Sequence, residues 1–390
     1  MKGRNLLMIP GPIEFSPRVL AAMAEPTTSH VAPDFIACFG DCLHRMKEVF
    51  MAPSYQPFVV AGSGTLAMDL AAANLVEPGD EALIINSGYF SDRMADIMKR
   101  YGASITVLHG DQVGDIPSAD EVQDALEDKT FQFVCITQVD TSTGVLADVK
   151  GITKVAKAAG CLTLVDGVCG TGGAECRTEE WGVDVYFTAS QKALGVPPGL
   201  ALLVASDRAM EKFFNRKDAV ANYYADFANW LPIMKAYAEG SPAYFGTPPV
   251  NLINALKVSL DEILTEGMEN RLRRHRHLAR AFRAGLGALG FEPVPVREEL
   301  LAPTLTAAYY PKGVPSTLPK KIIEQGVITA TGLHPKIKDQ YFRVGHMGIC
   351  NASDIISTLA AIERALVGEM EFSKGAGVTA AQSILYSGGS

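Results

Sequence analysis

The stretch TASQKALGVPPGL (residues 188–200) places a single lysine, Lys192, in a loop of Ser, Gly and Pro residues. The segments VDVYFTA (183–189) and GLALLVA (199–205) on either side have the apolar, β-rich composition of buried strands. A lysine held between buried strands loses hydration, which lowers its pKa. Such an amine is nucleophilic and forms a Schiff base with an aldehyde. The sequence therefore predicts a sheet with a reactive amine at its edge.

Asp166 supplies a carboxylate in a matching position. Leu162 to Asp166 have the composition of another strand, and the Gly-rich residues 167–173 are typical of the turn that leaves a sheet. In α/β proteins, groups that contact ligands gather where strands end. Taken singly, Lys192 and Asp166 would be ordinary loop residues. Together they predict pyridoxal phosphate (PLP), which needs a lysine for its aldehyde and an acid facing its ring nitrogen.

Composition limits the classes of protein to which the chain can belong. With 390 residues, 48% of them hydrophobic and 20% charged, the chain is long enough for two globular domains. Its net charge of −8 and pI near 5.5 argue against nucleic acid or an anionic membrane as the main partner. No apolar run approaches the roughly 18 residues that span a bilayer. The basic run Arg271–Arg283 has helical spacing, and we expect it to form a solvated or subunit-contacting face.

The cysteines and histidines indicate neither a metal nor a disulfide framework. The seven cysteines are odd in number, and their spacing matches neither zinc pairs nor paired disulfides. The seven histidines form no HExxH-like pattern, so we predict no catalytic metal. Unpaired cysteines favour a reducing compartment, and we take the cytoplasm as the default. The chain lacks a signal-peptide core and a C-terminal Ser-Lys-Leu, and the peroxisome and mitochondrion stay open as alternatives.

Seven β-rich runs alternate with amphipathic helical patterns between residues 58 and 204, which favours an α/β domain with a mostly parallel, seven-stranded sheet. The runs lie at 57–62, 81–86, 104–109, 131–139, 161–167, 183–189 and 199–205. Residues 251–267 have the pattern of a long connecting helix, and shorter strands mixed with helices follow. We therefore expect an N-terminal segment (1–20), a large domain (21–267), a smaller α+β domain (268–372) and, from its Gly, Ser and Ala content, a flexible tail (373–390).

Three motifs that follow predicted strands carry groups suited to a phosphorylated aromatic cofactor. Ser63-Gly64-Thr65 opens a helix and could cradle a phosphate, although a tight turn explains it equally well. Tyr89 or Phe90 could stack on a flat ring, although core packing is the simpler interpretation of either aromatic residue alone. Thr141 and its neighbours could reach a ring oxygen or a phosphate, although capping of a turn is their default role.

A basic residue in an apolar strand suggests how a substrate is held. Arg343 lies inside YFRVGHMG (341–348), where a charged group is rarely buried without a partner. Unless a protein acid pairs with it, a substrate carboxylate would do so through two parallel hydrogen bonds. The alternative, an arginine at a strand edge that points into solvent, is less consistent with the apolar neighbours.

Taken together, these segments resemble the class V (fold-type I) PLP-dependent aminotransferases. Within that family they are similar to the alanine–glyoxylate and serine–pyruvate group, especially its fungal-type alanine–glyoxylate members. The similarity runs from LLMIPGPIEFSPRVL (6–20) to YFRVGHMG (341–348), so it covers most of the chain. The motifs that carry it include AGSGTL (61–66), FSDR (90–93), VDTSTGVL (139–146), VDGVC (165–169), TASQKA (188–193) and AYFGTPPVNLINAL (243–256).

The resemblance implies a role for each residue that would contact the cofactor. Lys192 would hold PLP as an internal aldimine and then move the α-proton of the substrate, while Asp166 would pair with the ring nitrogen. The remaining contacts would come from Phe90 on the ring, Thr141 near the phenolic oxygen, and Ser63, Gly64, Thr65 and Gln191 at the phosphate. Thr65 and Thr141 stand where some relatives carry His and Ser, which puts fine contacts in doubt and leaves the chemistry unchanged.

Further implied residues concern the second subunit and the substrate. Tyr244 and Thr247 would reach the phosphate bound to the neighbouring subunit, which makes a homodimer necessary for the complete site. Arg343 would bind the substrate carboxylate, and Gly11, within Pro10-Gly11-Pro12 of the N-terminal segment, would close one wall of the active site.

The resemblance implies an aminotransferase that passes the amino group of L-alanine to glyoxylate, giving pyruvate and glycine by a ping-pong route. Serine–glyoxylate or serine–pyruvate transfer, or transfer between another small amine and 2-oxo acid, remains the alternative, because the sequence does not decide the donor. Class V also contains desulfurases and lyases, which are disfavoured because no cysteine here lies in a long flexible loop. A non-catalytic vitamin-B6-binding protein is the most distant alternative, since both Lys192 and Asp166 are present.

Overall fold

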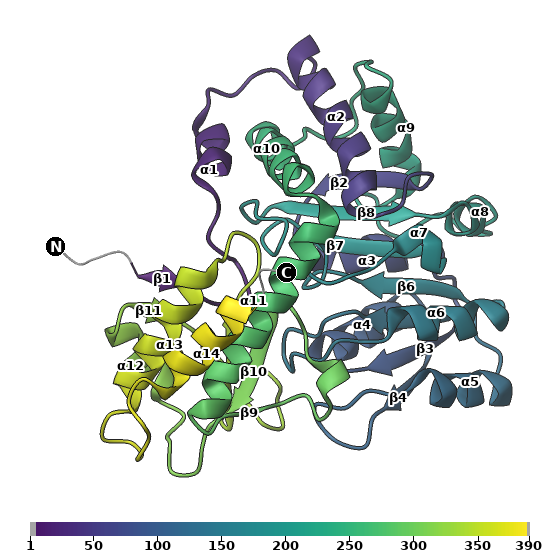
Figure 1. Cartoon of the computed structure of the whole chain (residues 1–390). Helices are drawn as coiled ribbons and strands as arrows, with labels where there is room; N and C mark the ends of the chain where they lie inside the picture. The colour runs from purple at the N-terminus through teal and green to yellow at the C-terminus, as the bar shows by residue number, and fades with distance from the viewer. Residues whose placement is uncertain (1–4, 388–390) are drawn as a thin grey trace.

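A seven-stranded sheet forms the centre of the larger part of the molecule (Figure 1). The structure is a computed structural model that describes residues 5–387. The strands of this sheet are β2 (Gln56–Ala61), β3 (Glu81–Asn86), β4 (Ser104–His109), β5 (Phe133–Thr137), β6 (Leu162–Asp166), β7 (Val185–Ala189) and β8 (Leu200–Ala205). Their order is β2-β8-β7-β6-β5-β3-β4. Only β8 runs antiparallel to its neighbours, β2 and β7, so the predicted mostly parallel α/β sheet is confirmed.

Helices cover both faces of this sheet. Strands β5, β7 and β8 are buried at every position, as expected for parallel-type strands shielded on two sides. In Figure 1, α5, α6 and α7 lie in front of the sheet, and α3 and α4 lie behind it. The helices of the two faces and the sheet end are α3 (Gly64–Leu75), α4 (Tyr89–Arg100), α5 (Ala119–Asp128), α6 (Val149–Ala158), α7 (Thr178–Trp181) and α8 (Asp207–Phe214).

Four more helices pack together beyond the β2 edge (Figure 1). They are α1 (Pro17–Ala24), α2 (Pro33–Val49), α9 (Phe227–Ala238) and α10 (Val250–Glu266). The ring centroids of Phe39 on α2 and Tyr237 on α9 lie 4.7 Å apart, in the range of favourable aromatic pairs. The side chains of this bundle belong to the same hydrophobic core as the sheet.

The smaller part has its own sheet and its own core. Its antiparallel sheet has the order β12-β13-β10-β9, and β1 (Leu6–Leu7) forms a separate parallel pair with β11 (Val327–Ile328). The sheet strands are β9 (Glu292–Pro293), β10 (Leu305–Tyr309), β12 (Ala330–Thr331) and β13 (Tyr341–Gly345). The helices are α11 (Met268–Ala288), the short 3-10 helix η1 (Glu298–Leu300), α12 (Leu318–Glu324), α13 (Ala352–Leu366) and α14 (Ala376–Ser387).

The C-terminal segment differs from the flexible tail that its composition suggests. Residues 376–387 form α14, which packs along α11 and α13 (Figure 1). Val378, Ala381 and Ile384 supply the apolar contacts of α14 with the smaller core. Glu363 also accepts hydrogen bonds from the backbone NH groups of Gly375 and Gly377, 2.8 and 2.9 Å long, which fixes the start of the helix. The last residues of the predicted tail, 388–390, and residues 1–4 of the N-terminal segment lie outside the described residues.

Within residues 5–387, no helix combines the length and the apolar character needed to cross a membrane. In the same part of the chain, no three or more His, Cys, Asp or Glu side chains gather in a group that could hold a metal ion. All seven cysteines are free thiols.

Candidate active site

Lys192 lies in the loop between β7 and β8, where the N-terminal segment covers it. Only 9% of Lys192 is exposed, and its Nζ donates a hydrogen bond to the carbonyl of Pro10. Gly11 lies against the lysine side chain: a Cβ added to Gly11, whose φ is +117°, would stand 2.5 Å from Lys192 Cδ. Glycine is therefore required at this close approach. Burial lowers the pKa of the Lys192 amine, which favours its neutral, nucleophilic form.

Asp166 lies at the carboxyl end of β6 and is almost fully buried, with 5% of its surface exposed. Its Oδ1 accepts a hydrogen bond of 2.8 Å from the backbone NH of Val168. Burial, reinforced by the nearby Asp140, raises the pKa of Asp166 to about 7, against the opposing effects of that hydrogen bond and of Lys192. A cation placed beside Asp166 would stabilise the ionised carboxylate and so lower this raised pKa.

Asp140, in the loop after β5, connects the predicted residues Phe90 and Thr141. The buried Asp140 accepts hydrogen bonds from the backbone NH groups of Phe90 and Ser142, 3.0 and 2.8 Å long, and so holds the first turn of α4. The half-buried ring of Phe90 lies at this turn, and Thr141 follows Asp140 directly. Asp140 was not among the predicted site residues. Its position before the predicted Thr141, in VDTSTG, was the available signal.

The start of α3 has the properties of an anion-binding site. Ser63 is its N-cap and makes no side-chain cap, so the first NH groups of the helix have no side-chain acceptor from this residue. A Cβ on Gly64 would stand 3.1 Å from Val168, in the turn after Asp166, so this helix start lies close to β6. Gln191, next to Lys192, has a buried Oε1 with no hydrogen-bond partner in the described residues. Such an unpaired buried polar atom is costly unless a ligand or water satisfies it.

Arg93 connects this helix start to the aromatic residues. Its guanidinium donates a 3.1 Å hydrogen bond to Thr65 Oγ1 and lies 4.9 Å from the centroid of the Phe90 ring. It also lies 5.2 Å from the centroid of the Tyr89 ring. The sequence prediction missed Arg93, although it ends the FSDR motif near the start of α4. The structure therefore adds a cation beside the predicted phosphate contacts.

Arg343, from the smaller part of the molecule, contacts the loop that carries Thr141. From β13, its Nε donates a 2.9 Å hydrogen bond to the carbonyl of Thr331, and its Nη1 donates a 3.1 Å bond to the carbonyl of Thr141. Within residues 5–387, no carboxylate forms an ion pair with Arg343, and Asp140 acts on it only through space. Burial lowers the pKa of Arg343. This arginine is therefore a half-buried charge without a protein counter-ion.

Tyr244 and Thr247 lie apart from this group of residues in the single chain. Both are exposed, and 65% of Tyr244 is accessible. The ring of Tyr244 lies 5.3 Å from that of His30, centroid to centroid, on the loop that leads into α10. The chain thus brings together ten of the twelve residues chosen from the sequence, with Arg93 and Asp140 beside them, and leaves these two facing outwards.

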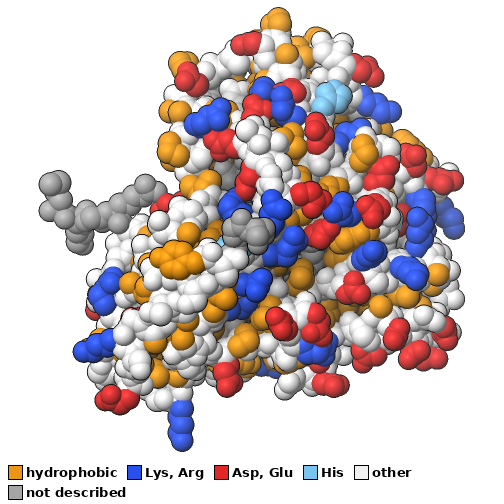
Figure 2. All heavy atoms as spheres, in the orientation of Figure 1, with side chains coloured by type: hydrophobic (Ala, Val, Ile, Leu, Met, Phe, Trp, Pro, Cys, Tyr) orange, Lys and Arg blue, Asp and Glu red, His pale blue; other side chains and the backbone are white. Residues whose placement is uncertain are grey.

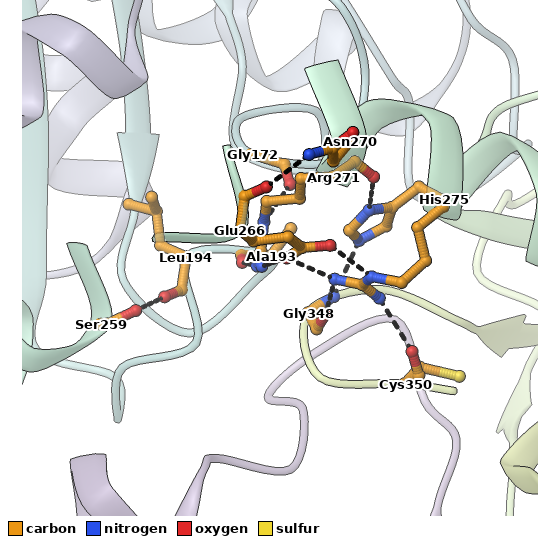
Figure 3. Close-up of polar contacts among 11 residues, drawn as sticks. Gly172, Ala193, Leu194, Ser259, Glu266, Asn270, Arg271, His275, Gly348 and Cys350 are labelled. Carbon is orange, nitrogen blue, oxygen red and sulfur yellow. Dashed lines mark hydrogen bonds and ion pairs between the residues drawn. The ribbon is translucent and has the colours of Figure 1, made fainter. Parts of the chain in front are cut away.

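The basic run on α11 contains a buried network rather than only a solvated face. Arg271 is 5% exposed, and Figure 3 shows it between the Gly-rich turn and the lysine loop. Its Nε and Nη2 donate hydrogen bonds of 2.8 and 2.7 Å to the carbonyls of Gly172 and Ala193, and its Nη1 pairs with Glu266 at 2.8 Å. His275, fully buried, accepts a 3.0 Å hydrogen bond from the NH of Gly348. The expected solvated or subunit-contacting face is therefore wrong for Arg271 and His275. Backbone carbonyls and Glu266 satisfy Arg271 inside the fold, and the carbonyl of Arg271 and the NH of Gly348 satisfy His275.

Comparison with known proteins identifies the family. The model of the family "Aminotransferase class-V" matches residues 15–356. The chain belongs to the class-V aminotransferases. It is 38% identical to alanine–glyoxylate aminotransferase 1 of Saccharomyces cerevisiae, covering 90% of this chain and 94% of the relative. It is 32% identical to the L-aspartate–glyoxylate aminotransferase of Paracoccus denitrificans, covering 98% and 96%.

A solved structure agrees with this assignment. The alanine–glyoxylate aminotransferase of Nostoc sp. superposes with a TM-score of 0.88 at 32% identity, covering 94% of this aminotransferase and 96% of that chain. The fold is accordingly that of the fold-type I aminotransferases, and the enzyme depends on PLP. The described residues fit this cofactor, because they provide a buried amine, a buried acid, an uncapped helix start and an unpaired Gln191 oxygen.

Proposed function

We propose that this aminotransferase moves the amino group of L-alanine to glyoxylate, giving pyruvate and glycine. In a ping-pong scheme, alanine delivers its amino group and leaves as pyruvate before glyoxylate enters, accepts the group and leaves as glycine. The observation that carries the proposal is that the buried Lys192, in the loop after β7, and the buried Asp166, at the end of the adjacent parallel strand β6, lie at one edge of the sheet. Arg343 acts on Lys192 through space and has no ion pair in the described residues. Glyoxylate is favoured as acceptor because the relatives described above differ in the donor that they are named for and share glyoxylate.

We assign the cofactor contacts to the residues gathered around Lys192, Asp166 and Arg343, a group that we call the crevice. PLP supplies an aldehyde and an aromatic ring that withdraws electrons from the substrate α-carbon. Lys192 would bind the aldehyde and then carry the α-proton on Nζ, while Asp166 would ionise beside the ring nitrogen and so keep that nitrogen protonated. The other proposed contacts are Phe90 on the ring, Thr141 near the phenolic oxygen, and Ser63, Gly64, Thr65 and Gln191 at the phosphate.

Arg343 is the proposed anchor of the substrate carboxylate. Its Nε and Nη1 bond backbone carbonyls, and its charge has no acid partner in the described chain. A carboxylate brought to this guanidinium would orient the substrate with its α-carbon towards Lys192. Pro10 and Gly11 lie against the Lys192 side chain, and this cover would exclude water and limit the size of the substrate.

The exposure of Tyr244 and Thr247 supports a homodimer. In the proposed dimer, the loop that carries them enters the crevice of the other subunit and bonds the cofactor phosphate there. Sedimentation of the purified enzyme tests this arrangement. A monomer at concentrations that sustain full turnover would exclude it, because each site would then be complete without the second subunit.

A matrix of donors and acceptors tests the substrate assignment. Alanine, serine and aspartate would each be combined with glyoxylate, and serine and aspartate also with pyruvate, because alanine and pyruvate only regenerate each other. The 2-oxo acid and amino acid products would be measured. We expect the highest kcat/KM for alanine with glyoxylate. A tenfold or greater preference for serine would instead select the serine–glyoxylate alternative, and an absence of glycine with every donor would overturn the choice of acceptor.

A further inference from the structure

A large cavity lies away from the lysine loop. It has a volume of about 900 Å³, within the range of small-molecule sites. Its walls come from the region between β5 and α6 and from α7 in the larger part, and from α11, α14 and the η1–β10 segment in the smaller part. None of the proposed cofactor or substrate contacts lines it. On the face shown in Figure 2, apolar side chains lie among basic and acidic ones beside α11.

Most of the cavity wall is apolar. Leu146 and Trp181 contribute from the larger part, and Leu286, Phe291 and Ile384 contribute from the smaller part. Exposed apolar surface of this kind, in a concave site with a few polar groups, is the usual lining of a ligand pocket. The apolar body of a ligand would therefore gain by leaving water here.

Arg283 gives the cavity a charge without a counter-ion. Its Nη1 donates a 2.9 Å hydrogen bond to the carbonyl of Ala302, and no carboxylate forms an ion pair with it in the described part of the chain. Burial lowers the pKa of Arg283 to about 10, although Glu298 opposes this through space. Arg271, on the same helix and similarly shielded, has Glu266 at 2.8 Å. The two arginines differ in that only Arg283 lacks an acid.

Charged side chains of both signs line the cavity beside Arg283. Glu299 pairs with Arg297 at 3.0 Å, and Glu175 pairs with Arg177 at 2.8 Å, so these acids are already engaged. The other charged residues of the lining are Asp148 and Glu298, with Lys150, Arg276 and Arg280 as further cations. One carboxylate on the shielded Arg283 and an uncharged, apolar remainder match a wall that is otherwise mostly apolar.

We propose that this cavity binds a small amphipathic monocarboxylate, with its carboxylate on Arg283 and its apolar body against Leu286 and Phe291. The carboxylate replaces the missing acid partner of Arg283 through charge-assisted hydrogen bonds. The site is independent of the proposed transamination, because it shares no residue with the cofactor and substrate contacts.

Octanoate and octanamide distinguish this proposal from a purely apolar cavity. The two probes have the same chain and differ in charge, and each would be titrated into the PLP-loaded enzyme by calorimetry. We expect octanoate to bind at one site per chain at least about tenfold more tightly than octanamide, because only octanoate can pair with Arg283. Equal affinity of the two probes, or no binding of octanoate, would overturn the proposal without the need for any variant.

Two variants on α11 locate the binding site. Arg283→Met should weaken octanoate binding about tenfold or more and leave octanamide binding unchanged. Arg273→Met is the matched control, because Arg273 lies exposed on the same helix and does not line the cavity. Unaltered octanoate affinity in Arg283→Met would contradict the assignment. Lys192→Ala should bind octanoate like the unsubstituted enzyme, so loss of transamination and loss of this site are separable.

The fluorescence of Trp181 reports the place of binding directly. The chain has two tryptophans, and Trp181 lines the cavity whereas Trp230 lies in the core of the larger part. Octanoate should change the emission of the enzyme, and Trp181→Phe should remove that change while calorimetric binding persists. A change of emission that survives Trp181→Phe would place the probe elsewhere and overturn the proposal.

Discussion

Arg271 and Arg343 are both arginines withdrawn from solvent near the lysine loop, and they differ in what surrounds them. Arg271 has Glu266 and the carbonyls of Gly172 and Ala193 as partners (Figure 3). Among the described residues, Arg343 bonds only the backbone carbonyls of Thr331 and Thr141. A buried charge that the chain itself neutralises holds structure together, whereas one that is left without an acid is available to an anionic ligand. The crevice should therefore govern activity, and the Arg271 network should govern stability.

Lys192→Ala should have the largest effect on activity, and it tests whether the crevice carries out the reaction. We expect transamination to fall to the limit of detection, because no other amine takes the place of Lys192 Nζ. The thermal midpoint of unfolding should stay the same or rise, since the substitution removes a desolvated amine. Pyruvate formation from alanine and a thermal unfolding curve measure the two effects. Lys154→Ala, at an exposed position on α6, is the control, and substantial turnover in Lys192→Ala would contradict the assignment.

Arg343→Ala should have the next largest effect, again on activity. The expected loss is about 3 kcal/mol of substrate binding, on the order of a 100-fold decrease in kcat/KM for alanine and glyoxylate, because the carboxylate loses its charged partner. Steady-state kinetics with both substrates measure it. Arg364→Ala, on α13, controls for the loss of an arginine elsewhere in the smaller part. Unchanged apparent affinity for both substrates would remove Arg343 from the site.

Arg271→Met should reverse the pattern and act mainly on stability. We expect the free energy of unfolding to fall by about 3 kcal/mol, because the carbonyls of Gly172 and Ala193 lose a buried donor and Glu266 loses one of its partners. Denaturant unfolding measures this loss, with Arg273→Met as a matched control on the exposed side of α11. If both substitutions cost the same, the buried network would not be the source of the stability.

The sequence predicts the parts of this structure that depend on local composition. All seven central strands were recognisable because they are continuous β-rich runs, and most of them, such as 200–205, are apolar and buried on both faces. The reversal of β8 was not predicted, since strand direction depends on how the chain returns to the sheet. Lys192 and Asp166 could be paired in advance because both follow strand ends, where ligand-binding groups meet.

The features that the sequence did not reveal are contacts between residues that are distant along the chain. The basic run on α11 shows helical spacing but gives no sign that Arg271 bonds Gly172 and Ala193, which are 99 and 78 residues away. The composition of α14 is rich in small residues, and its order follows from the surface that α11 presents to it. Arg93 and Asp140 similarly acquire their importance from contacts between loops, which a linear pattern does not record.

The pH dependence of the cofactor-free protein gives the smallest predicted effect. Burial raises the pKa of Asp166 to about 7, from an ordinary value of 3.8, so the folded chain keeps a proton that the unfolded chain releases above about pH 4. Unfolding then releases a proton between about pH 4 and 7, and the contribution of Asp166 to stability falls as the pH rises through this window. One pKa unit corresponds to about 1.4 kcal/mol, and we expect a loss of about 2 kcal/mol once relaxation around the charge is allowed for.

Asp166→Asn isolates this contribution, because it keeps the shape of the side chain and removes the titration. The difference in unfolding free energy between the two proteins, measured in denaturant at pH 4.5, 5.5 and 7, should shift steadily in favour of the asparagine variant. With PLP bound, the unsubstituted enzyme should lose less stability over the same range, because a protonated ring nitrogen beside Asp166 favours the carboxylate. Parallel pH profiles for the two cofactor-free proteins would mean that Asp166 is already ionised in the folded chain, and that the crevice, like the Arg271 network, contains its own counter-charge.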